Sequence, residues 1–481
     1  MKIAIIGMGV AGISVLREWT KEKELNPSLE LTVFGDENNF GTGVPYQRDN
    51  EHRLMNVPAE FTTIIPEKED DFVDWLENTH DEENSRYKYY PRQLFGTYLK
   101  ERMNGWLIQS KAKVIKEKVE AIGVLPNNQF RLTTSNGVED FHAVHLCIGN
   151  LPYKDPYNLI DHPNFIINPF PMEKNMPLIP EGARVGVLGT GLTSIDIFRY
   201  CHFNRPDLKV SFFSNSGRFK SISGKAKSIN YQFFTEENIK KTKENNNGFI
   251  PLETYIEWLK KEIENQELSL ESDWMNQPFG SKATIKEELD NSNKIGAVQS
   301  ILLDMNPLLT DLWMALTETD KQMFLEQYYG IWDKLRSSFP AESGKKLVSA
   351  WEENKINVFP NLSDIIKNKE SFEFILKEQK SQHIDYIINA IGTEKNVSFT
   401  MNRIPLLHQL LNERILQPET FGGVQVSLPD LSTISQKYGI LHTLKIHGEL
   451  IGGIQFGNNS VDIISESVRP AVEDIIQFIK D

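Results

Sequence analysis

Residues 2–12 read Lys2-Ile3-Ala4-Ile5-Ile6 and then Gly7-Met8-Gly9-Val10-Ala11-Gly12. The first run is apolar after its lysine, as in a parallel strand that is buried on both faces. Apolar residues at helical spacing follow the second run, from Ile13 to Trp19, and an alternating strand pattern covers residues 29–34. The order strand, glycine turn, helix, strand predicts a βαβ unit and therefore an α/β fold.

The spacing Gly-x-Gly-x-x-Gly between such a strand and helix is typical of a dinucleotide-binding turn. Gly7 allows the tight turn, Gly9 lets a pyrophosphate approach the backbone, and Gly12 lets the helix pack on the strand. The helix N-terminus then offers N–H groups to the phosphates. The alternative is a glycine-rich turn for another ligand, such as the methyl donor of a methyltransferase.

The end of the second strand departs from the usual pattern. It reads Val33-Phe34-Gly35-Asp36-Glu37, with glycine where an acid usually accepts the ribose hydroxyls. Asp36 or Glu37 is the candidate for that role, and a solvated acidic turn is the alternative.

A second unit of the same kind begins at residue 184. The strand Arg184 to Leu188 leads into Gly189-Thr190-Gly191-Leu192-Thr193-Ser194, where a small serine replaces the third glycine. The next strand, 210–213, ends at Ser214 with no carboxylate to repel a 2′-phosphate, and Arg218 and Lys220 follow as donors to it. This pattern favours NADP over NAD, and a solvated basic loop is the alternative.

Two dinucleotide units in one chain favour a flavoenzyme over a simple dehydrogenase. We expect FAD on the first unit and NADPH on the second, because a flavin enzyme needs both a bound flavin and a hydride donor.

Several further stretches resemble one family. They are Gly41–Tyr46, Leu54–Ala59, Tyr90–Leu99, Leu146–Asn150 and the strand Asp385–Thr393. On these stretches the chain resembles bacterial FAD/NAD(P)-binding proteins related to flavin-containing monooxygenases and to ornithine or lysine N-hydroxylases.

The resemblance implies roles for particular residues. Cofactor-binding residues would be Tyr46, Met55 and Asn56 in the loop beneath the flavin, Arg92 on the helix beside it, Gly149 and Gly392 after two strands, and Gly457 in the loop 452–459. It also implies that Asn56, as a hydrogen-bond donor, and Arg53 are catalytic candidates, with a structural role in the loop as the alternative. Three features depart from the family, namely Gly35, Ser194 and the absence of histidines around Arg336.

We therefore expect two nested Rossmann-like dinucleotide-binding domains with a helical insertion. The expected ranges are 1–180 and 385–481 for FAD, 181–230 and 345–384 for NADPH, and 231–344 for the insertion, which we expect to act as a lid over the cleft.

Composition narrows the function classes. The 52 basic and 66 acidic residues give a net charge of −14, which argues against a general nucleic-acid binder. Cys147 and Cys201 form no CxxC pair, which favours a reducing cytoplasm. We expect no signal peptide, no membrane span and no metal site, and nothing in the sequence sets the oligomeric state.

The expected function is oxidation–reduction of a small-molecule substrate with FAD and NADPH, most simply hydroxylation by a monooxygenase. One alternative is a flavin reductase or oxidase that passes electrons to a quinone, a protein or oxygen. Another is a sensor that binds FAD without catalysis.

Overall fold

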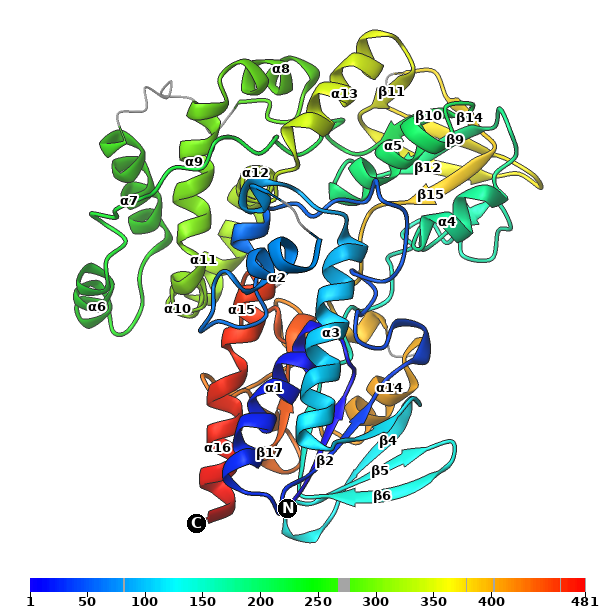
Figure 1. The fold of residues 1–481 in the computed structure, drawn as a ribbon. Coiled ribbons are helices and arrows are strands. Elements are labelled where there is room, and N and C mark those ends of the chain that lie inside the picture. The colour runs from blue at the N-terminus through cyan, green and yellow to red at the C-terminus, as the bar shows by residue number, and fades with distance from the viewer. Residues whose placement is uncertain (81–82, 267–276, 378, 401–402, 459, 481) are drawn as a thin grey trace. The chain divides into compact units, whose positions relative to one another are not determined.

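The computed structural model describes residues 1–481 apart from 81–82, 267–276, 378, 401–402, 459 and 481. The chain divides into two units (Figure 1). The first unit comprises Met1–Glu51, Pro58–Pro152 and Thr393–Asp481, and the second comprises His52–Val57 and Tyr153–Gly392.

The first unit is built on a largely parallel sheet with strand order β16-β17-β7-β1-β2-β3. Its strands are β1 (Lys2–Ile6), β2 (Glu30–Phe34), β3 (Lys113–Ile115), β7 (Ala143–Leu146), β16 (Ser432–Ser435) and β17 (Gly439–Ile446). Only the β16–β17 pair is antiparallel. A separate antiparallel sheet contains β4 (Val119–Val124), β5 (Phe130–Thr134) and β6 (Gly137–Phe141).

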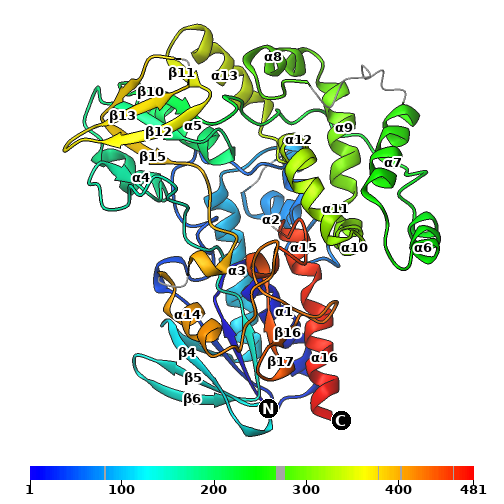
Figure 2. The same ribbon diagram turned by 180° about the vertical axis from the view of Figure 1, so that it is seen from behind.

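Helices and the antiparallel sheet cover the two faces of this parallel sheet. The helices are α1 (Val10–Leu25), α2 (Asp71–His80), α3 (Arg92–Ser110), α14 (Pro405–Asn412), α15 (Val461–Glu466) and α16 (Val468–Lys480). Helices α1, α3 and α16 lie on one face (Figure 1), and α14 with β4–β6 lies on the other (Figure 2). Alternate strand residues such as Ala4, Ile6 and Leu146 share a buried core with Phe130 of β5 and Leu407 of α14.

The second unit repeats this plan. Its parallel sheet has the order β11-β10-β9-β15-β8, from β8 (Phe165–Ile166), β9 (Arg184–Leu188), β10 (Lys209–Phe213), β11 (Ile356–Phe359) and β15 (Tyr386–Asn389). An antiparallel sheet again follows, with β12 (Leu362–Lys367), β13 (Phe372–Leu376) and β14 (Gln382–Ile384). The helices of this part are α4 (Met172–Asn175), α5 (Leu192–Asn204) and α13 (Ala341–Glu352).

The internal repeat is larger than the sequence predicted. The sequence predicted a repeat of the βαβ unit with its glycine turn. The structure also repeats a third parallel strand, an antiparallel sheet and a fourth parallel strand after it.

The connection between β10 and β11 contains the predicted helical insertion. Its helices are α6 (Glu236–Asn245), α7 (Leu252–Asn265), α8 (Lys282–Asp290), α9 (Ser292–Asp304), α10 (Leu309–Met314), α11 (Glu318–Met323) and α12 (Tyr329–Arg336), with a π-helical turn over Phe324–Tyr328. The insertion has its own hydrophobic core, which includes Trp258, Ile301 and Leu312.

Residues 52–57 and 153–180 belong to the second unit, whereas the sequence analysis placed them in the FAD-binding domain. Residues 153–180 belong to the second unit, because β8 pairs with β15 and the N–H of Lys154 donates to the carbonyl of Gly392 (3.0 Å). Residues 52–57 also belong there, because Arg199 Nε of α5 donates to the carbonyl of His52 (2.7 Å). The proline-rich stretch 152–180 contains only the single helical turn α4 and a short 3₁₀ turn, and α4 begins after Pro171.

Within the described part of the chain, none of the helices combines the length and the apolar character that crossing a bilayer requires.

Candidate nucleotide-binding sites

The first glycine turn has two positions that the protein itself requires to be glycine. Gly7 has a φ of +97°, and a Cβ there would lie 2.1 Å from the carbonyl oxygen of Cys147. A Cβ at Gly12 would lie 1.9 Å from the carbonyl oxygen of Gly7. These contacts hold the start of α1 against the ends of β1 and β7, as the motif predicts.

Gly9 is different, because packing within the protein leaves room for a side chain there. Its φ is −92°, and a Cβ would meet the Cα of Gly43 at 3.6 Å, an ordinary van der Waals contact. Neither the backbone conformation nor the packing of the protein requires glycine at position 9. A glycine at such a position is expected where a ligand approaches the backbone closely. Gly9 therefore meets the condition for a pyrophosphate at this turn.

The loop 41–46 lies beside that turn. The N–H of Gly41 donates to the carbonyl of Met8 (2.8 Å), and Gly43 has a φ of +60° and faces Gly9. The two facing glycines form a cradle of bare backbone at the N-terminus of α1, where anions bind favourably.

The structure brings Tyr46 and Arg92 together beside this cradle. The guanidinium carbon of Arg92 lies 6.0 Å from the centre of the Tyr46 ring, and the ring packs edge-on against Phe95 at 4.8 Å. Gly96 permits this approach, since a Cβ there would lie 2.0 Å from the carbonyl oxygen of Tyr46. Tyr98 of the same helix is fully buried, and its hydroxyl donates to Asp71 (2.8 Å), so its role is structural.

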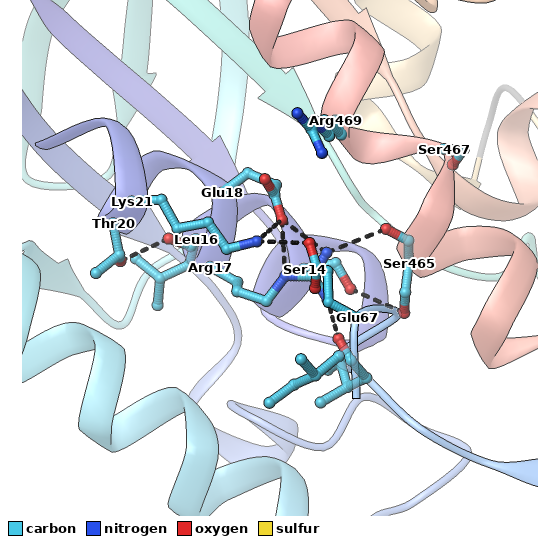
Figure 3. Close-up of polar contacts among 12 residues, drawn as sticks. Ser14, Leu16, Arg17, Glu18, Thr20, Lys21, Glu67, Ser465, Ser467 and Arg469 are labelled. Atoms are coloured by element: carbon cyan, nitrogen blue, oxygen red, sulfur yellow. Dashed lines mark hydrogen bonds and ion pairs between the residues drawn. The ribbon is translucent and has the colours of Figure 1, made fainter. Parts of the chain in front are cut away.

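Arg17 anchors α1 to neighbouring segments of the first unit (Figure 3). Its buried guanidinium pairs with Glu18 (2.7 Å), donates to the carbonyl of Ile64, and reaches the carbonyl of Ser465 in α15 at 3.4 Å. The hydroxyl of Ser14 donates to that of Ser465 (3.2 Å). One charged side chain thus connects α1 with the loop before α2 and with α15.

Asp36 is engaged by its own chain. One carboxylate oxygen accepts from the N–H (3.0 Å) and the side-chain amide (2.8 Å) of Asn38, and the other pairs with Lys118 (3.1 Å). These contacts, the backbone hydrogen bond first, lower the pKa of Asp36. Gly35 is glycine because a Cβ there would lie 2.8 Å from the Phe40 ring. A ribose contact by Asp36 stays a prediction, and it would have to share oxygens with Asn38 and Lys118.

The end of β17 supplies residues that the sequence analysis missed. Gly448 has a φ of +71° and lies beside the first turn of α1, where its Cβ would be 3.9 Å from that of Ala11. Glu449 follows, and burial raises its pKa against the opposing effect of Lys395. The available signal was a glycine within two residues of each strand end: Gly7 and Gly35 directly follow β1 and β2, and Gly448 follows β17 after His447. The carboxyl ends of these strands meet at one edge of the sheet.

The loop after β17 contains a polar atom that needs a partner. The side-chain oxygen of Gln455 is buried and, among the described residues, accepts no hydrogen bond. Asn458 donates to the carbonyl of Gly448 (2.6 Å), and Gly457 has a φ of +83°. Asn459, the end of the predicted flavin loop, lies outside the described residues. A buried acceptor without a partner fits a loop that a hydrogen-bonding ligand completes.

A buried chain of three rings runs from α1 to the same strand end. The indole N–H of Trp19 donates to Nε2 of His145 (2.8 Å), and Nδ1 of His145 lies 2.9 Å from Nε2 of His447. Burial lowers the pKa of both histidines, that of His447 to about 3. Because the indole can only donate, His145 carries its proton on Nδ1 and His447 carries its proton on Nδ1 as well.

The second glycine turn repeats the backbone hydrogen bond of the first turn at its first glycine. The N–H of Gly189 donates to the carbonyl of Phe213 (2.7 Å), as that of Gly7 does to Phe34 (2.8 Å). A Cβ at Gly189 would lie 2.6 Å from the carbonyl of Ala390. At Gly191 a Cβ would meet no described atom within 4 Å, so this turn is also open to a phosphate.

Gly149 and Gly392 occupy matching places after β7 and β15. Both have a positive φ, +74° and +99°, and a Cβ at either would meet no described atom within 4 Å. Their contact with a cofactor stays a prediction that this open backbone supports.

Arg218 and Lys220 lie on the loop after β10, as predicted. The hydroxyl of Thr190 in the glycine turn donates to the carbonyl of Arg218 (2.7 Å), and Ser214 accepts from the N–H of Gly217 (2.9 Å). Lys220 forms an ion pair with Asp333 of the helical insertion.

Arg53, Met55 and Asn56 belong to the second unit, whereas Gly9, Tyr46 and Arg92 belong to the first. The buried guanidinium of Arg53 lies 3.6 Å from the centre of the Phe170 ring and 3.7 Å from the carboxylate of Asp196 on α5. Met55 is buried and Asn56 is half-buried. These contacts give Arg53 a packing role, and catalysis by Arg53 or Asn56 stays a prediction.

The two cysteines are unsuited to thiol chemistry. Both are buried, and burial raises the pKa of Cys147 and raises that of Cys201 to about 12. The thiolate is the reactive form of cysteine, so neither side chain is an activated nucleophile.

Asp430, His442 and Asp474 come close enough to hold a metal ion. The ammonium of the fully buried Lys445 already lies among them, 3.1 Å from Asp430 and 2.5 Å from Asp474. This lysine supplies the positive charge that the carboxylates need.

Comparison with known proteins agrees with this geometry. Residues 4–151 match the family model described as FAD-NAD(P)-binding, which confirms the predicted cofactor class for this segment. A search of the curated proteins found no match.

Solved structures share the fold over the whole chain. The ornithine hydroxylase PvdA from Pseudomonas aeruginosa aligns at 13% identity over 99% of both chains, with a TM-score of 0.62. The L-lysine 6-monooxygenase from Pseudomonas syringae aligns at 13% identity over 99% of both chains (0.61). The bacillithiol disulfide reductase from Staphylococcus aureus aligns at 12% identity over 100% of this chain and 99% of that one (0.51). The predicted α/β fold with two Rossmann-like units is therefore confirmed.

Proposed function

We propose that this protein is an FAD-dependent, NADPH-using monooxygenase that hydroxylates a small molecule. The observation that carries the proposal is the pair of open glycine turns. Gly9 faces only the bare backbone of Gly43, and a Cβ at Gly191 would face no described atom within 4 Å. Two such turns in one chain suit a flavin and a nicotinamide nucleotide.

Bound FAD would supply the hydride acceptance and the oxygen activation that the protein's own side chains lack. In this scheme the backbone at Gly9 and the start of α1 would hold the pyrophosphate of FAD, with Tyr46 and Arg92 beside it. The backbone at Gly191 and the start of α5 hold the pyrophosphate of NADPH. Gln455 would offer its buried side-chain oxygen to a hydrogen-bonding edge of the flavin.

Two of the solved proteins that share this fold are an ornithine hydroxylase and an L-lysine 6-monooxygenase, and this supports hydroxylation over other flavin chemistry. A third is a disulfide reductase, which makes reduction of a disulfide the second candidate. The buried cysteines, whose pKa values burial raises, disfavour any version of that reaction in which a thiol of this chain takes part.

The test is anaerobic addition of NADPH to the purified, FAD-loaded protein, followed by air with L-ornithine, L-lysine or buffer alone. Bleaching of the flavin by NADPH, then N-hydroxylated product in proportion to NADPH consumed, supports the proposal. Hydrogen peroxide equal to the NADPH consumed with each amine instead identifies an oxidase. Protein that retains no FAD after reconstitution contradicts the proposal altogether.

A further inference from the structure

Basic residues from two adjoining segments of the second unit lie near the glycine turn 189–194. Arg218 and Lys220 lie on the loop after β10, and Lys334 lies on α12 of the helical insertion. One carboxylate, that of Asp333, accompanies them.

The loop and α12 are joined by both backbone and side chains. The N–H of Ser221 donates to the carbonyl of Lys334 (3.1 Å), and the ammonium of Lys220 lies 3.3 Å from the carbonyl of Asp333. Lys220 also forms its ion pair with the Asp333 carboxylate, and its side chain is only 13% exposed. The charge of Lys220 is therefore already compensated within the protein.

Lys334 is half-buried and has no such compensation. Burial lowers its pKa, the charges of Arg218 and Lys220 lower it further, and Asp333 opposes them. Across the residues that the structure describes, neither Lys334 nor Arg218 forms an ion pair with a carboxylate. Two cations on adjoining segments, neither in an ion pair with a described carboxylate and one of them half-buried, fit a site that is completed by an anion.

The position of this pair indicates which anion. Arg218 is held next to the glycine turn through the Thr190 hydroxyl, which donates to its carbonyl (2.7 Å). In this class of fold the adenosine ribose lies at the end of the second strand, here β10, with the pyrophosphate on the turn. A dianion at the 2′ position would reach the end of β10, where Ser214 replaces an acid.

We propose that Arg218 and Lys334 together bind the 2′-phosphate of NADPH, and that Lys220 and Asp333 hold the loop against α12 so that both cations face the same group. The proposal rests on the proposed function and adds to it a specificity-determining residue from the helical insertion. Lys334 thus makes the insertion part of the nicotinamide nucleotide site.

The experiment measures dissociation constants of the FAD-loaded protein for NADP⁺ and NAD⁺ by isothermal titration calorimetry. Lys334→Met removes the charge and keeps the aliphatic stem. Because charge-assisted hydrogen bonds are strong, NADP⁺ binding should weaken about 10- to 100-fold, with NAD⁺ binding changed less than about twofold. Lys334→Arg should keep most of the preference. Lys260→Met, an equal change of charge at an exposed position of α7, should leave both constants unchanged.

Equal weakening of NAD⁺ and NADP⁺ by Lys334→Met, or unchanged NADP⁺ binding, overturns the proposal. A wild type that binds the two nucleotides equally also overturns it. If the wild type binds neither, the proposed function fails. In that case the affinities of the wild type and Lys334→Met for 2′,5′-ADP and 5′-ADP, measured with inorganic phosphate as competitor, still decide whether Lys334 recognises a 2′-phosphate.

Discussion

The hydroxyl of Ser194 donates a hydrogen bond to the carbonyl oxygen of Gly189 at 2.7 Å. The matching position in the first turn is Gly12, where a Cβ would lie 1.9 Å from the carbonyl oxygen of Gly7. The turn 189–194 leaves room for a side chain at Ser194. The serine hydroxyl donates a hydrogen bond to the carbonyl of Gly189, the group that corresponds to the Gly7 carbonyl in the first turn. Serine in place of the third glycine therefore keeps the turn rather than breaking it.

This difference predicts opposite tolerance at the two positions. Ser194→Ala loses one hydrogen bond and should destabilise the protein by about 1 kcal/mol, with the nucleotide turn intact. Gly12→Ala places a methyl group against a carbonyl and should lower the thermal unfolding midpoint by several degrees more. Differential scanning fluorimetry of both variants checks this, and equal midpoints would show that the two turns pack alike.

Gly9→Val should give a folded protein that has lost its flavin. Its φ suits an ordinary residue and the nearest atom to a Cβ is 3.6 Å away, so the branched side chain would occupy the space of the pyrophosphate. The flavin-to-protein absorbance ratio after reconstitution measures the loss. Gly7→Val is the contrasting variant, since it collides with the Cys147 carbonyl and should reduce the yield of folded protein. Full flavin content in folded Gly9→Val excludes this turn as the FAD site.

Gln455→Leu should move apo-protein stability and flavin affinity in opposite directions. The buried oxygen of Gln455 accepts no hydrogen bond from the described residues, so removing it should stabilise the apo-protein by about 1 kcal/mol. If the flavin donates to that oxygen, the same change weakens flavin binding and shifts its reduction potential. Thermal unfolding of the apo-protein and flavin titration measure the two effects separately. A stabilised apo-protein with unchanged flavin affinity would place Gln455 away from the cofactor. This variant is more informative than Gly457→Val, because the φ of +83° at Gly457 strains any other residue.

Much of the fold followed from the sequence, because local patterns determined it. The strand ending at Ile6, the helix that contains Ile13 to Trp19 and the strand 184–188 are set by residues close in the chain, and the structure has them where predicted. The carboxyl ends of parallel strands were harder, because they meet only through long-range pairing. His447 and Gly448 come near α1 through the pairing of β17 with β7, which no local pattern encodes.

The contacts of Arg53 and Lys334 could not be predicted from the sequence either, because they also depend on long-range packing. Arg53 lies in a stretch that resembles a flavin loop, yet its side chain packs on Phe170 and pairs with Asp196, far along the chain. Lys334 had no sequence signal, because its relation to Arg218 depends on the backbone hydrogen bond from Ser221 to α12.

Glu288 of α8 predicts a pH dependence near neutrality. It is buried and accepts from the hydroxyl of Ser221 (3.0 Å) and the N–H of Ile222 (3.0 Å). Burial raises its pKa to about 7 against these hydrogen bonds. Between the pKa of Glu288 in the unfolded chain and pH 7, the carboxyl group is ionised in the unfolded chain but still protonated in the folded protein. The free energy of unfolding therefore falls as the pH rises through this range, and above pH 7 the loss stays constant. The free energy of unfolding of Glu288→Gln minus that of the wild type should therefore be more positive at pH 8 than at pH 5. A difference that is the same at both pH values contradicts the assignment.

The last prediction concerns the buried ammonium of Lys445, which pairs with Asp430 and Asp474. Lys445→Met leaves two carboxylates side by side without their cation, and breaking a buried pair in this way costs about 3–5 kcal/mol. Burial alone would raise the pKa of Asp430, but hydrogen bonds from Ser432 and the charge of Lys445 outweigh it and hold that pKa at about 2. A depressed carboxyl pKa contributes stability above its unfolded value and loses it as the pH falls toward 2. The deficit of Lys445→Met should therefore be largest above pH 4 and shrink on acidification, which thermal unfolding at stepwise pH can follow. Lys437→Met, at an exposed position of the neighbouring turn, is the matched control and should show neither the deficit nor its pH dependence. A Lys445→Met deficit that stays constant from pH 7 to pH 3 would mean that packing of the lysine stem, and not its charge, accounts for the loss.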